Sequence, residues 1–174
     1  GSKSLFVNCT MQTSNTKLSP VIDLQRCSAF AVQNRLNQPQ SGDINYVADT
    51  ANVGTSSAAS YLTKPVVLEN LSTAIDVRLT SNIRSTSSVE VYFRTTSSEE
   101  ARNINDLSWI PFNTTGTSDS TVTPSEDNET FKEYKYSTTG INEFTAFQIK
   151  IVMKGTNSAY PPVIRDMRGI ALAV

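Results

Sequence analysis

The residues that could do acid–base or nucleophilic chemistry are few in this sequence. Among 174 residues there is no histidine, and the two cysteines are Cys9 and Cys27. Without histidine the chain cannot build a Ser-His-Asp or Cys-His arrangement, an imidazole general base or a zinc site that uses imidazole. An all-cysteine zinc site needs four thiolates. The sequence therefore predicts no catalytic residues, no metal site and no cofactor.

Carboxylates are the other candidates for chemistry. The spacing of Asp119, Glu126, Asp127 and Glu129 matches no defined calcium loop, and a solvated turn is the simpler interpretation. Nothing singles out two of the 16 acidic residues as a pair for glycoside hydrolysis. The glycine-rich motifs that cradle phosphates are also absent from the sequence. We therefore expect a protein that is not an enzyme.

Four aromatic residues are candidates for a binding site. Rings exposed in loops can stack on sugars, and the residues in or beside expected loops are Trp109, Tyr46, Tyr61 and Tyr160. For Trp109, in Leu-Ser-Trp-Ile-Pro-Phe, the competing interpretation is a core or rim residue of a strand. The sequence leaves both interpretations open.

The elements that position these residues are predicted to be β-strands with one solvent-exposed face. Apolar and polar residues alternate over residues 75–80, 89–94 and 147–154, which is the pattern of a half-buried strand. In the third segment, the residues expected to face water are Gln148, Lys150 and Lys154. Weaker strand candidates are residues 5–11, 28–36, 61–68, 107–113, 131–136 and 167–174.

These strands, together with 22 Ser and 21 Thr, predict an all-β fold. We expect a single antiparallel β-sandwich, jelly-roll-like, of roughly nine strands. One short connector helix is expected at residues 97–103. The polar segments 37–60 and 113–130 exceed the usual length of a connection, so we expect them to be mobile or held by a partner.

Length and charge limit the organisation and the partners. A chain of 174 residues can bury one core, so a single domain over residues 1–174 is predicted. The formal charge is −1 and the charges are dispersed, so nucleic acid is not an expected partner. The longest apolar runs fall far short of the roughly 20 residues of a membrane span.

Gly1-Ser2-Lys3 resembles a cloning scar. Cys9 and Cys27 are expected to be buried thiols, with one disulfide as the alternative.

The pattern P-V-I-x-x-x-R-x-x-A-x-A-V occurs twice, in residues 19–32 and 161–174. A chance match this good is expected in roughly one such chain in ten, so a duplication is suggested and not established. Each copy predicts a strand with two apolar faces, which is typical of a central strand. We expect the copies to be neighbours near the middle of the sandwich, with another chain against their small faces as the alternative. The small faces carry Ala29 and Ala31, and Ala171 and Ala173.

A series of motifs resembles a known family. The motifs, in order, are Lys17-Leu-Ser-Pro-Val-Ile-Asp-Leu-Gln-Arg26, Asn34-Arg-Leu-Asn37, Tyr61-Leu-Thr-Lys-Pro-Val-Val-Leu68, Val89-Glu-Val-Tyr-Phe-Arg94, Phe131-Lys-Glu-Tyr-Lys-Tyr136, Phe147-Gln-Ile-Lys-Ile-Val152 and Ile164-Arg-Asp-Met-Arg-Gly-Ile-Ala-Leu172. Each motif is weakly specific, and the series is moderately so. The series resembles a domain of large virion structural proteins, of the tail or baseplate, in contractile-tailed phages of marine bacteria and cyanobacteria.

This resemblance implies a non-enzymatic module, the C-terminal part of a longer protein, built into or displayed on a phage virion. Its implied partners are other virion proteins, including further copies of itself, and its implied place is the tail of a particle assembled in the host cytoplasm. The resemblance carries no catalytic residues. Our first hypothesis is assembly through protein–protein contacts. The alternative is a carbohydrate-binding module of a tail fibre or appendage that attaches to host surface glycans. A hydrolase of such glycans is a third hypothesis, which we do not expect.

Overall fold

The computed structural model describes residues 8–14, 17, 20–23, 36–43, 46, 48–51 and 59–173. The chain forms two compact units, residues 1–33 and residues 34–174. The described residues of the first unit are all exposed and include no helix or strand. Cys9 has a free, exposed thiol, so the expectation that it is buried is wrong. Cys27 lies outside the described residues.

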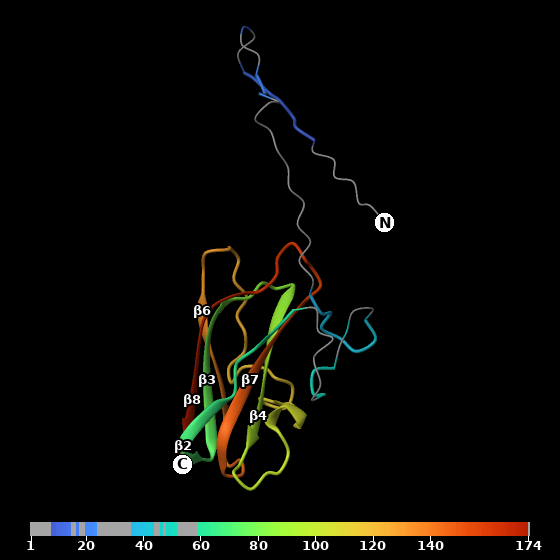
Figure 1. Ribbon diagram of the computed structural model, residues 1–174. Coiled ribbons are helices and arrows are strands. Elements are labelled where there is room, and N and C mark those ends of the chain that lie inside the picture. Colours follow the sequence, from blue (N-terminus) through green and yellow to red (C-terminus); the bar gives the residue numbers. More distant parts are fainter. Residues whose placement is uncertain are drawn as a thin grey trace. The chain divides into compact units, whose positions relative to one another are not determined.

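The second unit is all-β, as Figure 1 shows. Its described residues form eight strands and one short 3-10 helix. In chain order these are β1 (Ser60–Leu62), β2 (Val66–Ser72), β3 (Ala74–Asn82), β4 (Ser87–Thr96), η1 (Ile104–Asp106), β5 (Ile110–Pro111), β6 (Lys132–Thr138), β7 (Phe144–Gly155) and β8 (Val163–Leu172). No described helix is long and apolar enough to cross a membrane.

The strands form two antiparallel sheets. The larger sheet has the order β1-β7-β4-β5. β1 pairs with residues 150–152 of β7, and β2 pairs with residues 144–147 of the same strand. Its longest ladder joins β4 to β7, from Ser87 opposite Gly155 to Thr96 opposite Ala146. The smaller sheet has the order β6-β3-β8, with β3 in the middle. β8 is therefore an edge strand.

The core lies between the two sheets and is built by the alternation in the sequence. Ile75, Val77 and Leu79 of β3 are at most 1% exposed and face the larger sheet's buried side chains. Burial of each such side chain contributes about 1.5–3 kcal/mol. The core residues of the larger sheet include Val89, Val91, Phe93, Phe147, Ile149 and Ile151. The predicted antiparallel β-sandwich is confirmed.

The three strands predicted from strict alternation are present as β3, β4 and β7. Of the weaker candidates, some form strands and others do not. Residues 131–136 and 167–174 correspond to β6 and β8. Residues 61–68 are divided between β1 and β2, because Pro65 interrupts the ladder, and residues 107–113 contribute only β5. Residues 8–11 form no strand, and residues 28–35 lie outside the described part.

The connector helix expected at residues 97–103 is not formed. A turn closes there with a hydrogen bond from Glu100 N to Ser97 O, and the 3-10 helix η1 begins at Ile104. Asn103 caps η1, because its side chain accepts a hydrogen bond from Asn105 N at 2.9 Å. A cap with an amide side chain thus determines the start of the helical turn, and Glu100 instead pairs with Arg102.

β8, the second copy of the repeated pattern, does not lie in the middle of the sandwich. Its small face does meet the core, where Ala171 packs, and a methyl group added at Gly169 would lie 3.6 Å from the Phe147 ring. Its large face is in contact with solvent: Ile170 is 46% and Leu172 is 42% exposed. The expectation of a central strand is wrong for this copy. In the first copy, residues 24–32 lie outside the described part.

The polar segment 113–130 is held by its own chain. Buried Asn82 donates hydrogen bonds of 2.8 and 2.7 Å to the carbonyl oxygens of Asp127 and Thr130. Ser125 N donates to Ile83 O, and Gly116, with φ of +84°, allows the chain to approach β4 closely. These hydrogen bonds therefore attach the segment to the strands of its own chain.

Candidate functional site

The outer face of the larger sheet carries a buried polar layer. Lys150 and Lys154 of β7 are 0% and 2% exposed, and Arg94 of β4 is 3% exposed, because Asn37, Asp49 and residues 105–109 lie over them. The prediction that Gln148, Lys150 and Lys154 face water is therefore wrong. Alternation separates the two faces of a strand, but it does not tell whether a polar segment covers the second face.

Charges in this layer are paired with carboxylates and rings. Lys150 Nζ donates to the Asp49 carbonyl oxygen and lies 3.5 Å from its Oδ1. Lys154 Nζ lies 2.7 Å from Glu90 Oε2, which also accepts a 2.5 Å hydrogen bond from the Tyr92 hydroxyl. Burial lowers the pKa of Lys150, and the neighbouring Asp49 offsets part of that effect. Burial, aided by Glu90, raises the pKa of Tyr92.

Trp109 and Tyr46, two of the predicted sugar-stacking candidates, belong to this layer. Trp109 is 3% exposed and lies under Arg94, whose guanidinium carbon is 4.2 Å from the ring centroid. Tyr46 is half-buried, and Lys154 Nζ lies over its ring, 5.1 Å from the ring centroid. Cations that stack on buried rings stabilise the covering segments. The core interpretation of Trp109 is thus the correct one.

Tyr61 and Tyr160 are exposed and line two different hollows. Tyr160, 48% exposed, lines a hollow of about 710 Å³ at one end of the sandwich, where Arg84 lies 5.3 Å from its ring centroid. Glu126 and Asn157 are among the other lining residues. Tyr61, 54% exposed, lines a hollow of about 550 Å³ between β1 and the start of β8. The structure therefore brings the four predicted aromatics to three places.

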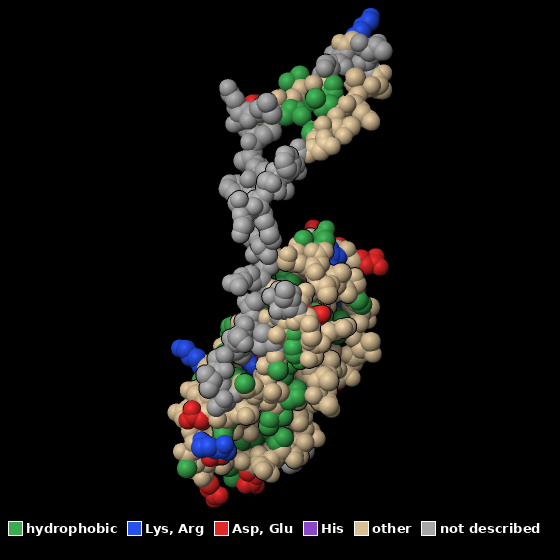
Figure 2. Space-filling model, turned by 90° about the vertical axis from the view of Figure 1, so that its right-hand side faces the viewer, with side chains coloured by type: hydrophobic (Ala, Val, Ile, Leu, Met, Phe, Trp, Pro, Cys, Tyr) green, Lys and Arg blue, Asp and Glu red, His purple; other side chains and the backbone are tan. Residues whose placement is uncertain are grey.

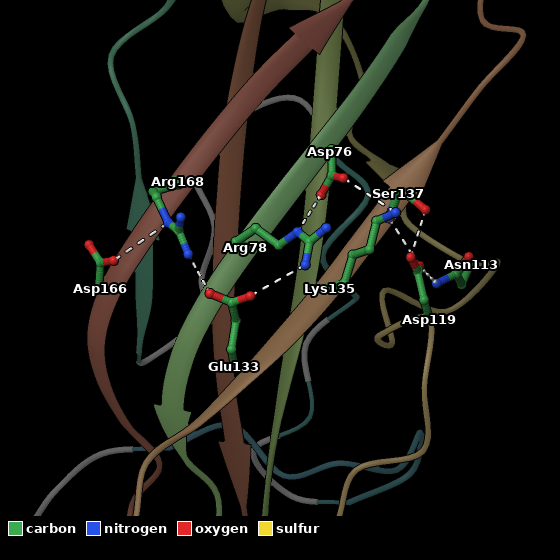
Figure 3. Close-up of polar contacts among 9 residues, drawn as sticks. All are labelled: Asp76, Arg78, Asn113, Asp119, Glu133, Lys135, Ser137, Asp166 and Arg168. Atoms are coloured by element: carbon green, nitrogen blue, oxygen red, sulfur yellow. Dashed lines mark hydrogen bonds and ion pairs between the residues drawn. The ribbon is translucent and has the colours of Figure 1, made fainter.

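The outer face of the smaller sheet carries a surface network of ion pairs, shown in Figure 3. Arg78 of β3 lies 3.1 Å from Asp76 and 3.3 Å from Glu133 of β6. Lys135 lies 3.3 Å from Asp76, and Arg168 of β8 pairs with Glu133. The network therefore links all three strands. Exposed pairs such as these contribute little to stability, so the arrangement of the charges matters more than their number.

The charges form rows across the strands. Arg78 lies directly opposite Lys135 on one side and Arg168 on the other, which makes a basic row. One step along the same face, Glu133 and Asp166 lie opposite the two sides of Thr80, which makes an acidic row. The like charges within a row would repel, and the neighbouring row neutralises them. Both rows end at β8.

The side of the sandwich formed by β1, β2 and β8, called here the open side, gathers apolar side chains. Ten large hydrophobic residues are exposed among the described residues of the second unit, and eight of them lie on these three strands. They are Tyr61, Leu62, Val66, Val67, Leu71, Val163, Ile170 and Leu172. β8 forms a ladder with β3 alone among the described residues, so its other backbone edge is available for pairing.

Other surfaces of the second unit are less distinctive. On the face in Figure 2, charged side chains of both signs lie among apolar and uncharged ones, and neither sign forms a large patch. Asp119 and Asp127 are bound by their own chain: Asp119 accepts a hydrogen bond from the hydroxyl of Ser137 in β6 at 2.6 Å, and Asp127 accepts one from Thr130 N in its own loop at 2.6 Å. Within the described part of the chain, no three His, Cys, Asp or Glu side chains gather in a way that could hold a metal ion.

The sequence contained one signal for the covered face and one for the open side. Val152, 0% exposed, follows Lys150 on the same face of β7, and an apolar residue in a polar row indicates a cover. The large-residue face of β8 is recognisable in the sequence as apolar, but not as exposed.

Comparisons with protein-family models, curated proteins and solved structures return no match for this chain.

Proposed function

We propose that this chain is a non-enzymatic structural module of a phage virion, in the tail or baseplate, which works through protein–protein contacts. The order of sequence motifs supports the placement in a virion. The open side of the sandwich supports the mode of action. In this proposal the module is assembled in the host cytoplasm as part of a larger protein or complex.

The open side is the observation that carries the proposal. An edge strand of ten residues with exposed Ile170 and Leu172 is a template for pairing with another chain. Val67 of β2, 79% exposed, lies on the same side. Exposed apolar side chains that gather in this way are typical of a surface that a partner covers. The rigid pairing of β3 with both neighbours gives such a partner a preformed sheet to extend.

The placement in a virion is tested on purified particles of the virus that encodes the chain. Mass spectrometry should detect its peptides, and an antibody raised against residues 34–174 should label the tail in electron micrographs. The same antibody, previously adsorbed with the purified chain, is the control. Particles that lack these peptides, from infected cells that contain the chain, would contradict the proposal.

A second candidate function, glycan binding, is favoured by the Tyr160 hollow. An exposed ring with a carboxylate, an amide and a guanidinium nearby offers a stacking face and hydrogen-bonding groups to a sugar, and about 710 Å³ is a usual size for a ligand site. The residues that would act are Tyr160, Glu126, Asn157 and Arg84. The wall around Ser125 is already held, because Ser125 N donates a hydrogen bond to Ile83 O and the Arg84 guanidinium donates one to Ser125 O, which lowers the cost of ordering.

This candidate is tested by affinity electrophoresis in gels that contain polysaccharides of the host surface. Retardation that disappears with Tyr160→Ala and persists with Tyr61→Ala would support it. Tyr61 is the matched control because it is similarly exposed, 54% against 48% for Tyr160, and lines the other hollow. Equal retardation of both variants and the wild type, or none for the wild type, would contradict it.

A further inference from the structure

The charge rows on the smaller sheet are complementary to themselves. The basic row runs from Lys135 through Arg78 to Arg168, and the acidic row joins Glu133 to Asp166. The rows lie next to each other and both reach the open edge of the sheet at β8. A rotation by 180° about an axis between them, perpendicular to the sheet, would place the basic row of one copy in line with the acidic row of another.

We propose that β8 pairs antiparallel with β8 of a second copy of this chain, with a twofold axis at Met167. Residue positions in such a pair add to a constant, so Asp166 of each copy lies opposite Arg168 of the other. The two smaller sheets then form one continuous sheet of six strands. This inference rests on the proposed function, because it names the partner of the open side.

The charges on β8 favour a twofold axis at Met167 over an axis at residue 166 or 168. An axis at residue 166 would place two Asp166 carboxylates opposite each other, and an axis at residue 168 would do the same with two Arg168 guanidinium groups. Like charges opposite each other destabilise an antiparallel pair. Only the axis at Met167 pairs opposite charges twice, without any change in the fold of either copy.

The apolar residues of the open side favour the same occupant. β1 and β8 flank one hollow, so a copy that pairs with β8 brings its own β1 and β2 toward those of its neighbour. Residues such as Val67 and Leu71, which solvent reaches in the single chain, would then be covered by equivalent residues. A foreign strand would cover β8 but would leave β1 and β2 exposed.

The experiment uses two charge reversals on the whole chain, Asp166→Lys and Arg168→Glu. Either variant alone places two pairs of like charges at the seam, so its dissociation constant in sedimentation velocity should rise at least about 100-fold over that of the wild type. In an equimolar mixture both pairs become attractive again, and the dimer should return. Arg102→Glu, which reverses an exposed charge in the connection between β4 and η1, should dimerise as the wild type does.

Cross-linking tests the register directly, in a background that carries Cys9→Ser and Cys27→Ser. Met167→Cys should form a disulfide between copies on mild oxidation, since residues opposite each other in a pair lie about 4.5–5.5 Å apart between Cα atoms. Ile170→Cys should not, because the two positions lie six residues out of register, about 20 Å apart. A wild type that stays monomeric, single variants that dimerise unchanged, or a mixture that stays monomeric would overturn the inference. The particle experiment judges the virion placement separately.

Discussion

Lys150 is the side chain on which the covering of the larger sheet depends most. Its ammonium group is fully buried, with Asp49 beside it and the rings of Tyr92 and Trp109 at 5.0 and 5.1 Å. We expect Lys150→Met to lower the free energy of unfolding by about 3 kcal/mol, because the buried Asp49 carboxylate loses its closest cation. Urea denaturation of the two chains measures the difference.

The double variant Asp49→Asn with Lys150→Met separates the lost charge pair from lost packing. It should recover most of the stability, since the Asp49 carboxylate is then removed together with its closest cation, while Lys154 keeps its 2.7 Å pair with Glu90. Lys135→Met is the matched control: Lys135 is 41% exposed and should cost less than about 1 kcal/mol. Equal losses for Lys150→Met and the double variant would show that the ion pair does not matter.

Asp119 gives the fold a dependence on acid. Partial burial acts to raise the pKa of Asp119, but hydrogen bonds from Ser137 and Asn113 outweigh it, so its pKa lies below the ordinary value. A carboxyl group whose pKa is lower in the folded state stabilises the fold above its unfolded pKa, near 4. That stabilisation disappears as the pH falls through the folded value.

The Asp119→Asn variant should therefore be less stable than the wild type at pH 7, by at most about 1 kcal/mol because Asp119 is solvent-exposed. The difference should shrink as the pH falls below 4. Urea denaturation at pH 7 and pH 3 measures both values. A Ser137→Ala change should reduce the same pH-dependent difference, and a difference that is equal at both pH values would contradict the assignment.

At the scale of elements, the loop 113–130 depends on one strand residue. Asn82 of β3 is 2% exposed and satisfies the carbonyl oxygens of Asp127 and Thr130. We expect Asn82→Ala to cost about 2 kcal/mol, because two partly buried acceptors lose their donor. Thermal unfolding measures the loss. The exposed Asn142 is the control, and Asn142→Ala should stay within about 0.5 kcal/mol.

The same elements show what the sequence can predict. β3, β4 and β7 were predictable because the period of two is a local property of each strand. The roles of their second faces were not, because the cover over Lys150 comes from residues about 100 positions away. The sequence of β8 fits a strand in the middle of a sheet as well as a strand at its edge. Whether it is central or at an edge depends on pairing, which is not local.

The candidate site divides in the same way. Tyr61 and Tyr160 were predicted as exposed rings, and they are. Trp109 was offered as both a stacking and a core residue, and its burial depends on Arg94 and on the segment around Thr50, whose carbonyl oxygen accepts from Trp109 N. The charge rows are recognisable only once the register places Arg168 opposite Arg78.

In the whole molecule, we expect the open side to be covered when the protein is at work. Amide hydrogen exchange compares the isolated chain, diluted until it is monomeric, with the chain assembled in purified virus particles. Peptides from β8, residues 163–172, should exchange more slowly in the particle, while peptides from β4, which pairs with β7 along its whole length, should be unchanged. Exchange in β8 that is equally fast in the two states would show that this edge is not the surface through which the protein acts.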